Sequence, residues 1–138
     1  MTTRMTSHRT MGGGLLTLAL VAAMLGGACS STPQICTDLS QLSSSVKALT
    51  DVNIGSGSLS TLQSKLSTVQ TDLTAVKQSA DQAIGPQVSA MDAAVQTLKQ
   101  AIQAAVASPS AASISAVATA SKATKTAFDS LKAAKPDC

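Results

Sequence analysis

Hydrophobic residues recur at alternating steps of three and four along the chain from residue 35 onward, which is the period of an amphipathic α-helix. The most regular stretch, from Leu59 to Ala83, has the spacing of a seam that one helix buries against another. Its members are Leu59, Leu62, Leu66, Val69, Leu73, Val76, Ala80 and Ala83. This stretch therefore predicts a helix with one buried stripe and a polar opposite face.

Three further segments show the same spacing less regularly and predict three more helices. Their stripe positions are Ile35, Leu39, Leu42, Val46 and Leu49; then Val88, Met91, Val95, Leu98 and Ile102; then Ile114, Val117, Thr124, Phe128 and Leu131. The last stripe is the poorest, because Ser121 and Thr124 interrupt it. Phe128 is the sole aromatic residue of the chain, and its place in this stripe predicts a core position.

Capping residues and helix breakers divide the chain at the same places. The pairs Thr32-Pro33 and Ser108-Pro109 each place a capping hydroxyl before a proline at the first helical position. Ser60 and Gln63 have capping-box spacing, and Gly85-Pro86 ends or kinks the helix that precedes it. We expect helices over about residues 33–52, 59–84, 86–107 and 109–134.

Two all-α arrangements fit these four helices. In an up-down four-helix bundle, every helix packs against two neighbours. In the alternative, the segments on either side of Gly85-Pro86 form one long kinked helix, and the first and last helices flank its two halves. The bundle buries more apolar surface, and burial is the main favourable term in folding, so the bundle is the expected fold.

Residues 1–28 have the three parts of a secretory signal peptide. These are a polar start carrying Arg4 and Arg9, an apolar run from Leu15 to Leu25, and small residues before a cleavage site. The apolar run is far shorter than the roughly 20 residues that a membrane-spanning helix needs. We therefore expect an exported protein whose single helical domain, residues 29–138, follows the signal.

The cleavage region Leu25-Gly26-Gly27-Ala28-Cys29 resembles a bacterial lipobox, with Leu25 one position earlier than in the usual pattern. The resemblance implies that Cys29 becomes the new N-terminus and carries palmitate or another acyl chain, which anchors the protein in the cell membrane. The alternative is ordinary signal-peptidase cleavage after Ala28, which leaves Cys29 as a thiol in a secreted, extracellular protein.

The chain has three cysteines, Cys29, Cys36 and Cys138, and an odd number leaves one thiol without a partner inside the molecule. Lipidation of Cys29 removes that odd thiol. Cys36 and Cys138 then remain as one pair in an oxidising compartment, where a structural disulfide is expected to form. We therefore expect one disulfide to close the helical domain.

The charge balance changes once the signal is removed. Lys and Arg total 10 and Asp and Glu total 7 in the whole chain, but Arg4 and Arg9 lie in the signal, so the net charge falls from +3 to +1. After residue 28 there is no Arg, Trp or Tyr, so the groups that read bases by bidentate contacts or stack on them are missing. We therefore expect no nucleic-acid partner.

Catalytic groups are missing from the same region. After residue 28 the sequence holds neither His nor Glu. This composition excludes Ser-His-Asp and Cys-His sites, the H-E-x-x-H metal motif and paired-glutamate acid/base sites. The seven Asp are scattered and form no calcium-loop pattern. We therefore predict that the protein is not an enzyme and has no catalytic residue, cofactor or metal site.

The Cys-ended signal, the Ala/Ser/Thr-rich helices and the C-terminal Cys138 resemble those of small, uncharacterised helical lipoproteins and secreted proteins of actinobacteria. The resemblance implies no activity. We expect a non-enzymatic cell-envelope lipoprotein with a structural or protein-interaction role, whose partners are the membrane and an envelope protein or the cell wall. The alternative is a helical-bundle carrier that binds a lipid or another apolar ligand. The seam at Leu59–Ala83 also allows pairing between two copies of the chain, as a homo-oligomer.

Overall fold

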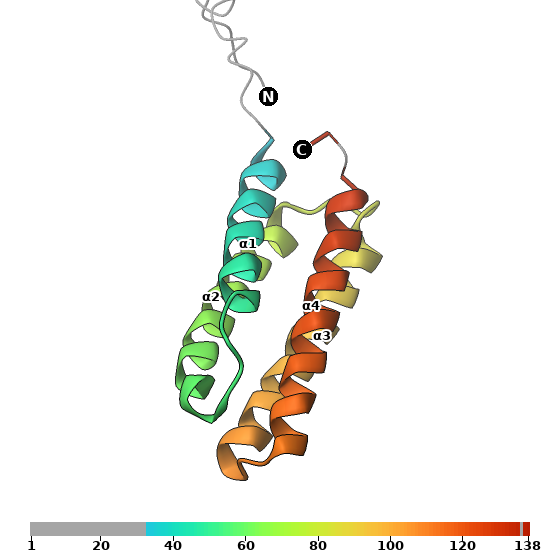
Figure 1. Cartoon of the computed structure of the whole chain (residues 1–138). Coiled ribbons are helices and arrows are strands. Elements are labelled where there is room, and N and C mark those ends of the chain that lie inside the picture. Colours follow the sequence, from blue (N-terminus) through green and yellow to red (C-terminus); the bar gives the residue numbers. More distant parts are fainter. Residues whose placement is uncertain (1–32, 136) are drawn as a thin grey trace, which may run out of the picture. The chain divides into compact units, whose positions relative to one another are not determined.

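The computed structural model describes residues 33–135 and 137–138, and these residues fold into an antiparallel bundle of four α-helices (Figure 1). The helices are α1 (Gln34–Thr50), α2 (Leu59–Ser79), α3 (Gly85–Ala107) and α4 (Ala111–Ala133), and a short 3-10 helix, η1 (Ser56–Ser58), precedes α2. The predicted up-down four-helix bundle is therefore confirmed. The expected signal peptide, residues 1–28, and the expected lipid site, Cys29, lie outside the described residues.

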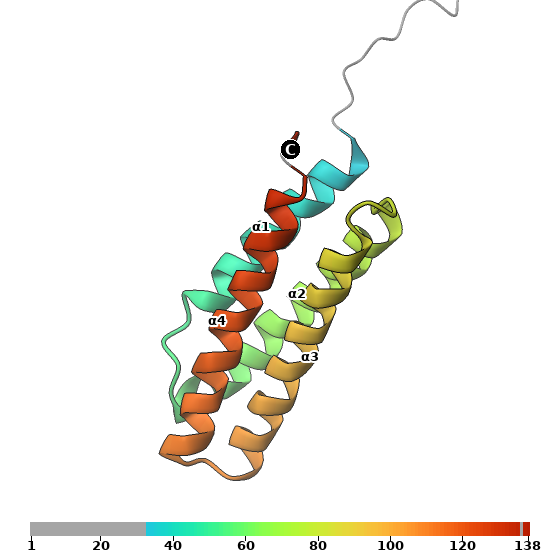
Figure 2. The ribbon, with the colours of Figure 1, turned by 90° about the vertical axis from the view of Figure 1, so that its right-hand side faces the viewer.

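Each helix runs antiparallel to the next one along the chain, and α4 returns to lie beside α1 (Figure 2). Packing is closest between α3 and α4 and between α1 and α2, and it is sparsest between α1 and α4. The alternative of one long kinked helix is wrong, because the chain reverses between α2 and α3 and the two helices pack side by side. Because of this reversal, both helices bury their apolar stripes in a shared core, and burial of apolar surface is the main favourable term in folding.

The second helix is shorter than the sequence predicted, because it ends at Ser79 and not at residue 84. The backbone of Ala80 is extended, with φ −70° and ψ 137°, and this conformation stops the helical ladder. Asp81 then accepts backbone hydrogen bonds from Ala83 (3.0 Å) and Ile84 (3.3 Å), which forms a tight turn. The break therefore comes before Gly85, which begins α3 and does not end α2.

The cap of α4 also differs from the prediction. Ser108 ends α3, and the residue that caps α4 is Ser110. The Ser110 hydroxyl accepts a hydrogen bond from the backbone N–H of Ser113 (3.1 Å), while the Ser113 hydroxyl accepts one from the N–H of Ser110 (2.9 Å). This reciprocal pair satisfies two backbone donors at the helix start, so the two-residue shift is stabilised locally.

The predicted starts of α1 and α2 change in the same way. Pro33 is the N-cap of α1 and has no side-chain hydrogen bond to the helix, while Thr32 lies outside the described residues. Ser60 lies inside the first turn of α2, whose N-cap is Ser58. The Ser58 hydroxyl instead donates to the carbonyls of Asn53 (2.8 Å) and Gly55 (2.9 Å), so it fixes the turn of η1 before the helix begins.

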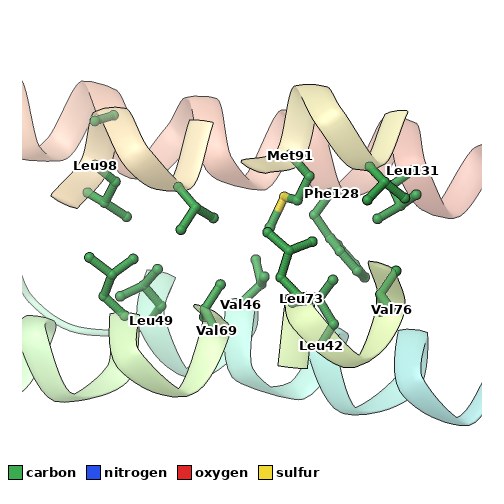
Figure 3. Packing of buried hydrophobic residues seen from close by; sticks show 14 of the residues in the cluster. Leu42, Val46, Leu49, Val69, Leu73, Val76, Met91, Leu98, Phe128 and Leu131 are labelled. Atoms are coloured by element: carbon green, nitrogen blue, oxygen red, sulfur yellow. The ribbon is translucent and has the colours of Figure 1, made fainter. Parts of the chain in front are cut away.

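The core forms where the apolar stripes of the four helices meet (Figure 3). On α2, every stripe residue from Leu59 to Val76 is at most 5% exposed, which confirms the strongest pattern in the sequence. Ala80 is only half-buried and Ala83 is exposed, because both lie beyond the end of the helix. Ile84, which belonged to no predicted stripe, is buried in the connection between α2 and α3.

The interrupted stripe of α4 is buried despite its polar members. Ser121 and Thr124 both lie in the interior, and Thr124 is completely buried. The Thr124 hydroxyl donates to the carbonyl of Ala120 at 2.9 Å, so burial leaves its proton satisfied. Phe128 is 5% exposed and reaches into the space between the helices, which confirms the core position predicted for it (Figure 3).

Candidate functional site

The start of α1 and the segment after α4 meet at one end of the bundle, which we call the disulfide end. Cys36, in the first turn of α1, and Cys138 form a disulfide across 102 residues, with their Cα atoms 5.1 Å apart. The predicted pairing is therefore confirmed. Cys36 is buried and Cys138 is exposed. The third predicted site residue, Cys29, lies outside the described residues.

This disulfide links the first turn of α1 to the segment after α4, and α1 and α4 are the neighbouring helices that pack least closely. In the chain-entropy account, closing a loop of about 100 residues restricts the unfolded chain and stabilises the fold by up to about 4.7 kcal/mol. The core is built from aliphatic side chains with one aromatic ring, so this contribution is a large share of the total. The disulfide therefore closes the interface between α1 and α4, where neighbouring helices pack most sparsely.

At the same end, an ion pair joins the segment after α4 to the turn between α2 and α3. Lys135, after α4, places its Nζ atom 3.3 Å from Oδ2 of Asp81, in the turn between α2 and α3. The hydrogen bond from the Lys135 ammonium holds the pKa of Asp81 below its ordinary value, against an opposing effect of desolvation. The backbone N–H groups of Ile84 and Ala83 act in the same direction. All three interactions favour the charged carboxylate.

A groove follows the α1/α4 seam away from the disulfide. Its first part, about 180 Å³, lies beside Cys36 and Cys138, and its second part, about 340 Å³, extends towards the far end of α1. Ser43 and Lys132 line both parts. Lys125 and Asp129, on the wall formed by α4, pair with each other at 2.6 Å. Leu39 lines the first part of the groove and Val46 and Phe128 line the second, so the walls combine polar and apolar groups.

A second hollow, of about 510 Å³, lies between the start of α1 and the end of α2. Asp38 is the one charged side chain among the residues that line it. The carboxylate accepts hydrogen bonds from Nε2 of Gln34 (2.9 Å) and from the hydroxyl of Ser79 (2.6 Å). Asp38 is only 5% exposed, so this carboxylate is held largely away from water.

A second hydrogen bond between a serine and an aspartate joins α1 and α2 farther along, but here the serine is on α1 and the aspartate is on α2. There the Ser45 hydroxyl of α1 donates to the carboxylate of Asp72 on α2. Sequence reasoning treated the aspartates as scattered and missed both pairs. A signal was present for Asp38, because it follows Ile35 by three residues and precedes Leu42 by four, which places it on the edge of the buried stripe.

Within residues 33–135 and 137–138, His, Cys, Asp and Glu side chains form no group of three or more that could hold a metal ion. In the same part of the chain, none of the helices combines the length and the apolar character that crossing a membrane requires.

Comparison with known proteins gives no match to a family model, to a curated protein or to a solved structure.

Proposed function

We propose that the protein is a non-enzymatic lipoprotein of the cell envelope, tethered to the membrane through Cys29 and acting through structural or protein-protein contacts. The observation that carries the proposal is the position of the disulfide. It fixes the C-terminal segment to the first turn of α1, close to the residue from which the tether would extend. One end of the bundle is thus suited to anchoring, and the other is free to project.

The projecting end consists of the α1–α2 and α3–α4 connections, which we call the distal end (Figure 1). The segments that form it, residues 52–64 and 100–121, contain no charged residue. Val106, at 48% exposure, is the exposed large hydrophobic residue of the described chain, and it lies here. Protein interfaces are depleted of charge at their centres, so this end is the one suited to a protein partner. With α3 about 35 Å long, the distal end lies that far from the disulfide end of the bundle.

Two other expectations lose support. Pairing of two copies through the seam of α2 needs an exposed stripe, but this stripe is buried within the chain. A carrier needs room between the helices. In the described bundle that space is occupied by large side chains under 2% exposed, and the hollows described above open to the surface. We therefore favour the interaction protein over the carrier and over a homo-oligomer built on the seam.

Intact mass of the protein from its native host, measured before and after reduction and alkylation, tests the tether. We expect a chain that begins at Cys29 and carries acyl chains, with two further thiols that appear only on reduction. C29S should move the protein from the membrane fraction to the medium. The matched control, C36S combined with C138S, should keep it in the membrane fraction. An unacylated native protein would overturn the proposal in favour of a secreted one.

Site-specific photo-crosslinking in living cells tests the partner face. A crosslinker at Val106 should capture a discrete envelope protein, while one at the exposed Gln78, near the disulfide end, serves as the matched control. Capture from Gln78 but not from Val106 would assign the interaction to the opposite end of the bundle.

A further inference from the structure

Asp38 is a buried carboxylate whose hydrogen bonds both come from neutral groups. Nε2 of Gln34 donates to one carboxylate oxygen, and the hydroxyl of Ser79 donates to the other. An ionised carboxylate offers about four acceptor positions, so one position remains on each oxygen. Asp38 is the fifth residue of α1, and the field of a helix N-terminus falls off within its first turn. The charge of Asp38 is therefore hydrogen-bonded but not neutralised.

More exposed aspartates of the bundle do have cationic partners. Three aspartates whose side chains are 38% to 57% exposed each pair with a lysine: Asp92 with Lys77, Asp129 with Lys125 and Asp81 with Lys135. Asp38 is only 5% exposed, and within the described part of the chain it has no such pair. Burying an ionised group is costly unless it is paired as well as hydrogen-bonded. Asp38 is therefore the carboxylate at which an added cation would gain most.

The hollow between the start of α1 and the end of α2 gives a ligand access to this carboxylate. Its volume is about 510 Å³, whereas one water occupies about 30 Å³ in the liquid, so a chain of several atoms fits. Apart from Asp38, the lining residues are apolar or neutral: Pro33, Ile35, Ala75, Gln34, Gln78 and Ser79. A cation that entered the hollow would meet one negative charge and no competing positive charge on its walls.

The walls favour an ammonium group over a metal ion. Ca²⁺ takes about six to eight oxygen ligands, and the described residues bring no three metal-ligating side chains together. A primary ammonium carries three donors on a compact charge, so it can use the open acceptor position on each oxygen of Asp38. A short methylene stem would lie against Ile35 and Ala75, which supply apolar wall.

We propose that this hollow binds a primary ammonium group carried on a short apolar stem, with Asp38 as the residue that holds the charge. Two sources share this chemistry, a soluble amine and the ethanolamine headgroup of a lipid. The site involves neither Cys29 nor the distal end of the bundle. Its failure is therefore distinguishable from a failure of the proposed function.

NMR titration of the oxidised full-length chain with n-butylammonium, at pH 6 and low ionic strength, tests the site. We expect saturable shifts of the Gln34 side-chain amide, with a dissociation constant of about 1 mM, as a partly screened ion pair and a short stem support. n-Butyltrimethylammonium has the charge without the donors, and 1-butanol lacks the charge. Both should bind about tenfold more weakly. Equal binding of the three probes, or no saturation by about 30 mM n-butylammonium, would overturn the proposal.

Substitution of the carboxylate assigns the binding to Asp38. D38N should weaken n-butylammonium binding about tenfold or more, because the amide keeps the shape but loses the charge. D72N is the matched control. Asp72 also accepts a hydrogen bond from a serine across α1 and α2, but it does not line the hollow, so D72N should bind as the parent does. Equal affinities of D38N and the parent would overturn the proposal.

If D38N does not fold, a charge placed on the wall decides instead. Gln78 is exposed on α2 and lines the hollow, so substitution there leaves the core intact. Q78K should weaken n-butylammonium binding and Q78E should strengthen it, each severalfold, because the added charge lies beside the ligand. Equal affinities of Q78K and Q78E would overturn the proposal.

Vesicles distinguish the two sources of the ammonium group. Binding to vesicles with ethanolamine headgroups that exceeds binding to vesicles with choline headgroups, and that D38N removes, assigns the ligand to a lipid. Equal binding to the two kinds of vesicle, with the n-butylammonium site intact, assigns it to a soluble amine.

Discussion

Lys135 and Asp81 form an ion pair of 3.3 Å that joins the segment after α4 to the turn between α2 and α3. These residues are 54 positions apart, and the pair secures two connections at the disulfide end. Asp81 also holds two backbone N–H groups of its own turn, so one carboxylate fixes both the local and the distant contact.

Because the pKa of Asp81 is lowered in the folded protein, the ionised carboxylate stabilises the fold, and this stabilisation decreases as the pH falls. The contribution is fully present above the unfolded pKa of 3.8, and it is lost as the pH falls through the folded pKa. D81N should therefore be less stable than the parent at pH 6, and the difference should shrink as the pH falls through the folded pKa of Asp81. Urea unfolding across this range checks the prediction, and K135A should reduce the difference at pH 6. A difference that grows as the pH falls would contradict it.

The disulfide should dominate the effect of cysteine substitutions. We expect C36S combined with C138S to lower the free energy of unfolding by up to about 4.7 kcal/mol, because the unfolded chain regains the freedom that the closed loop removes. Urea unfolding with and without reductant measures this effect. In the unlipidated chain, C29S serves as the control and should leave the midpoint unchanged. An identical midpoint for reduced and oxidised protein would show that the bond does not stabilise the bundle.

Truncation of the α2 stripe tests the core. Leu62 is completely buried, whereas its neighbour Thr61 is exposed. L62A should lower the free energy of unfolding by about 2 to 5 kcal/mol, through lost burial and the cavity left behind. T61A, one residue away on the same helix, should stay within about 0.5 kcal/mol. Similar losses in the two variants would mean that α2 does not bury the face described here.

The start of α4 gives a direct choice between two serines. S110A removes the capping hydroxyl and should lower the free energy of unfolding by about 1 kcal/mol. S108A should stay within about 0.5 kcal/mol, because the Ser108 group that contacts Ser113 is its backbone carbonyl. Thermal or urea unfolding of both variants measures the difference. A larger loss of stability for S108A than for S110A would show that Ser108 caps α4, as the sequence predicted.

The sequence predicted the four helices and their buried faces because apolar spacing reflects which side of a helix meets the core. The sequence pattern did not predict where α2 ends or which residue caps α4. Ala80 and Ala83 continue the spacing of α2 past Ser79, since alanine fits a buried helix face and an extended segment equally well. At the start of α4, Ser108 and Ser110 both suit a cap, and only the reciprocal bond with Ser113 selects the second.

The candidate site was less predictable. The cysteine count identified the disulfide because pairing follows from parity and compartment. Asp38 was missed because its significance depends on Ser79, which lies 41 residues away and on another helix. Spacing along one helix shows that an aspartate lies near the core, but the hollow beside it appears only when two helices are placed together. The groove at the α1/α4 seam depends on tertiary packing in the same way.

The bond between Cys36 and Cys138 encloses all four helices in one covalent ring. Under the proposed tether, a mechanical load that pulls on Cys29 enters the domain just before this ring. Tension between the membrane and anything attached to the C-terminal residues then passes from Cys36 to Cys138 through the sulfur atoms. Apart from the first turn of α1, the helices lie outside that load path, so tension between these two points does not pull the bundle apart.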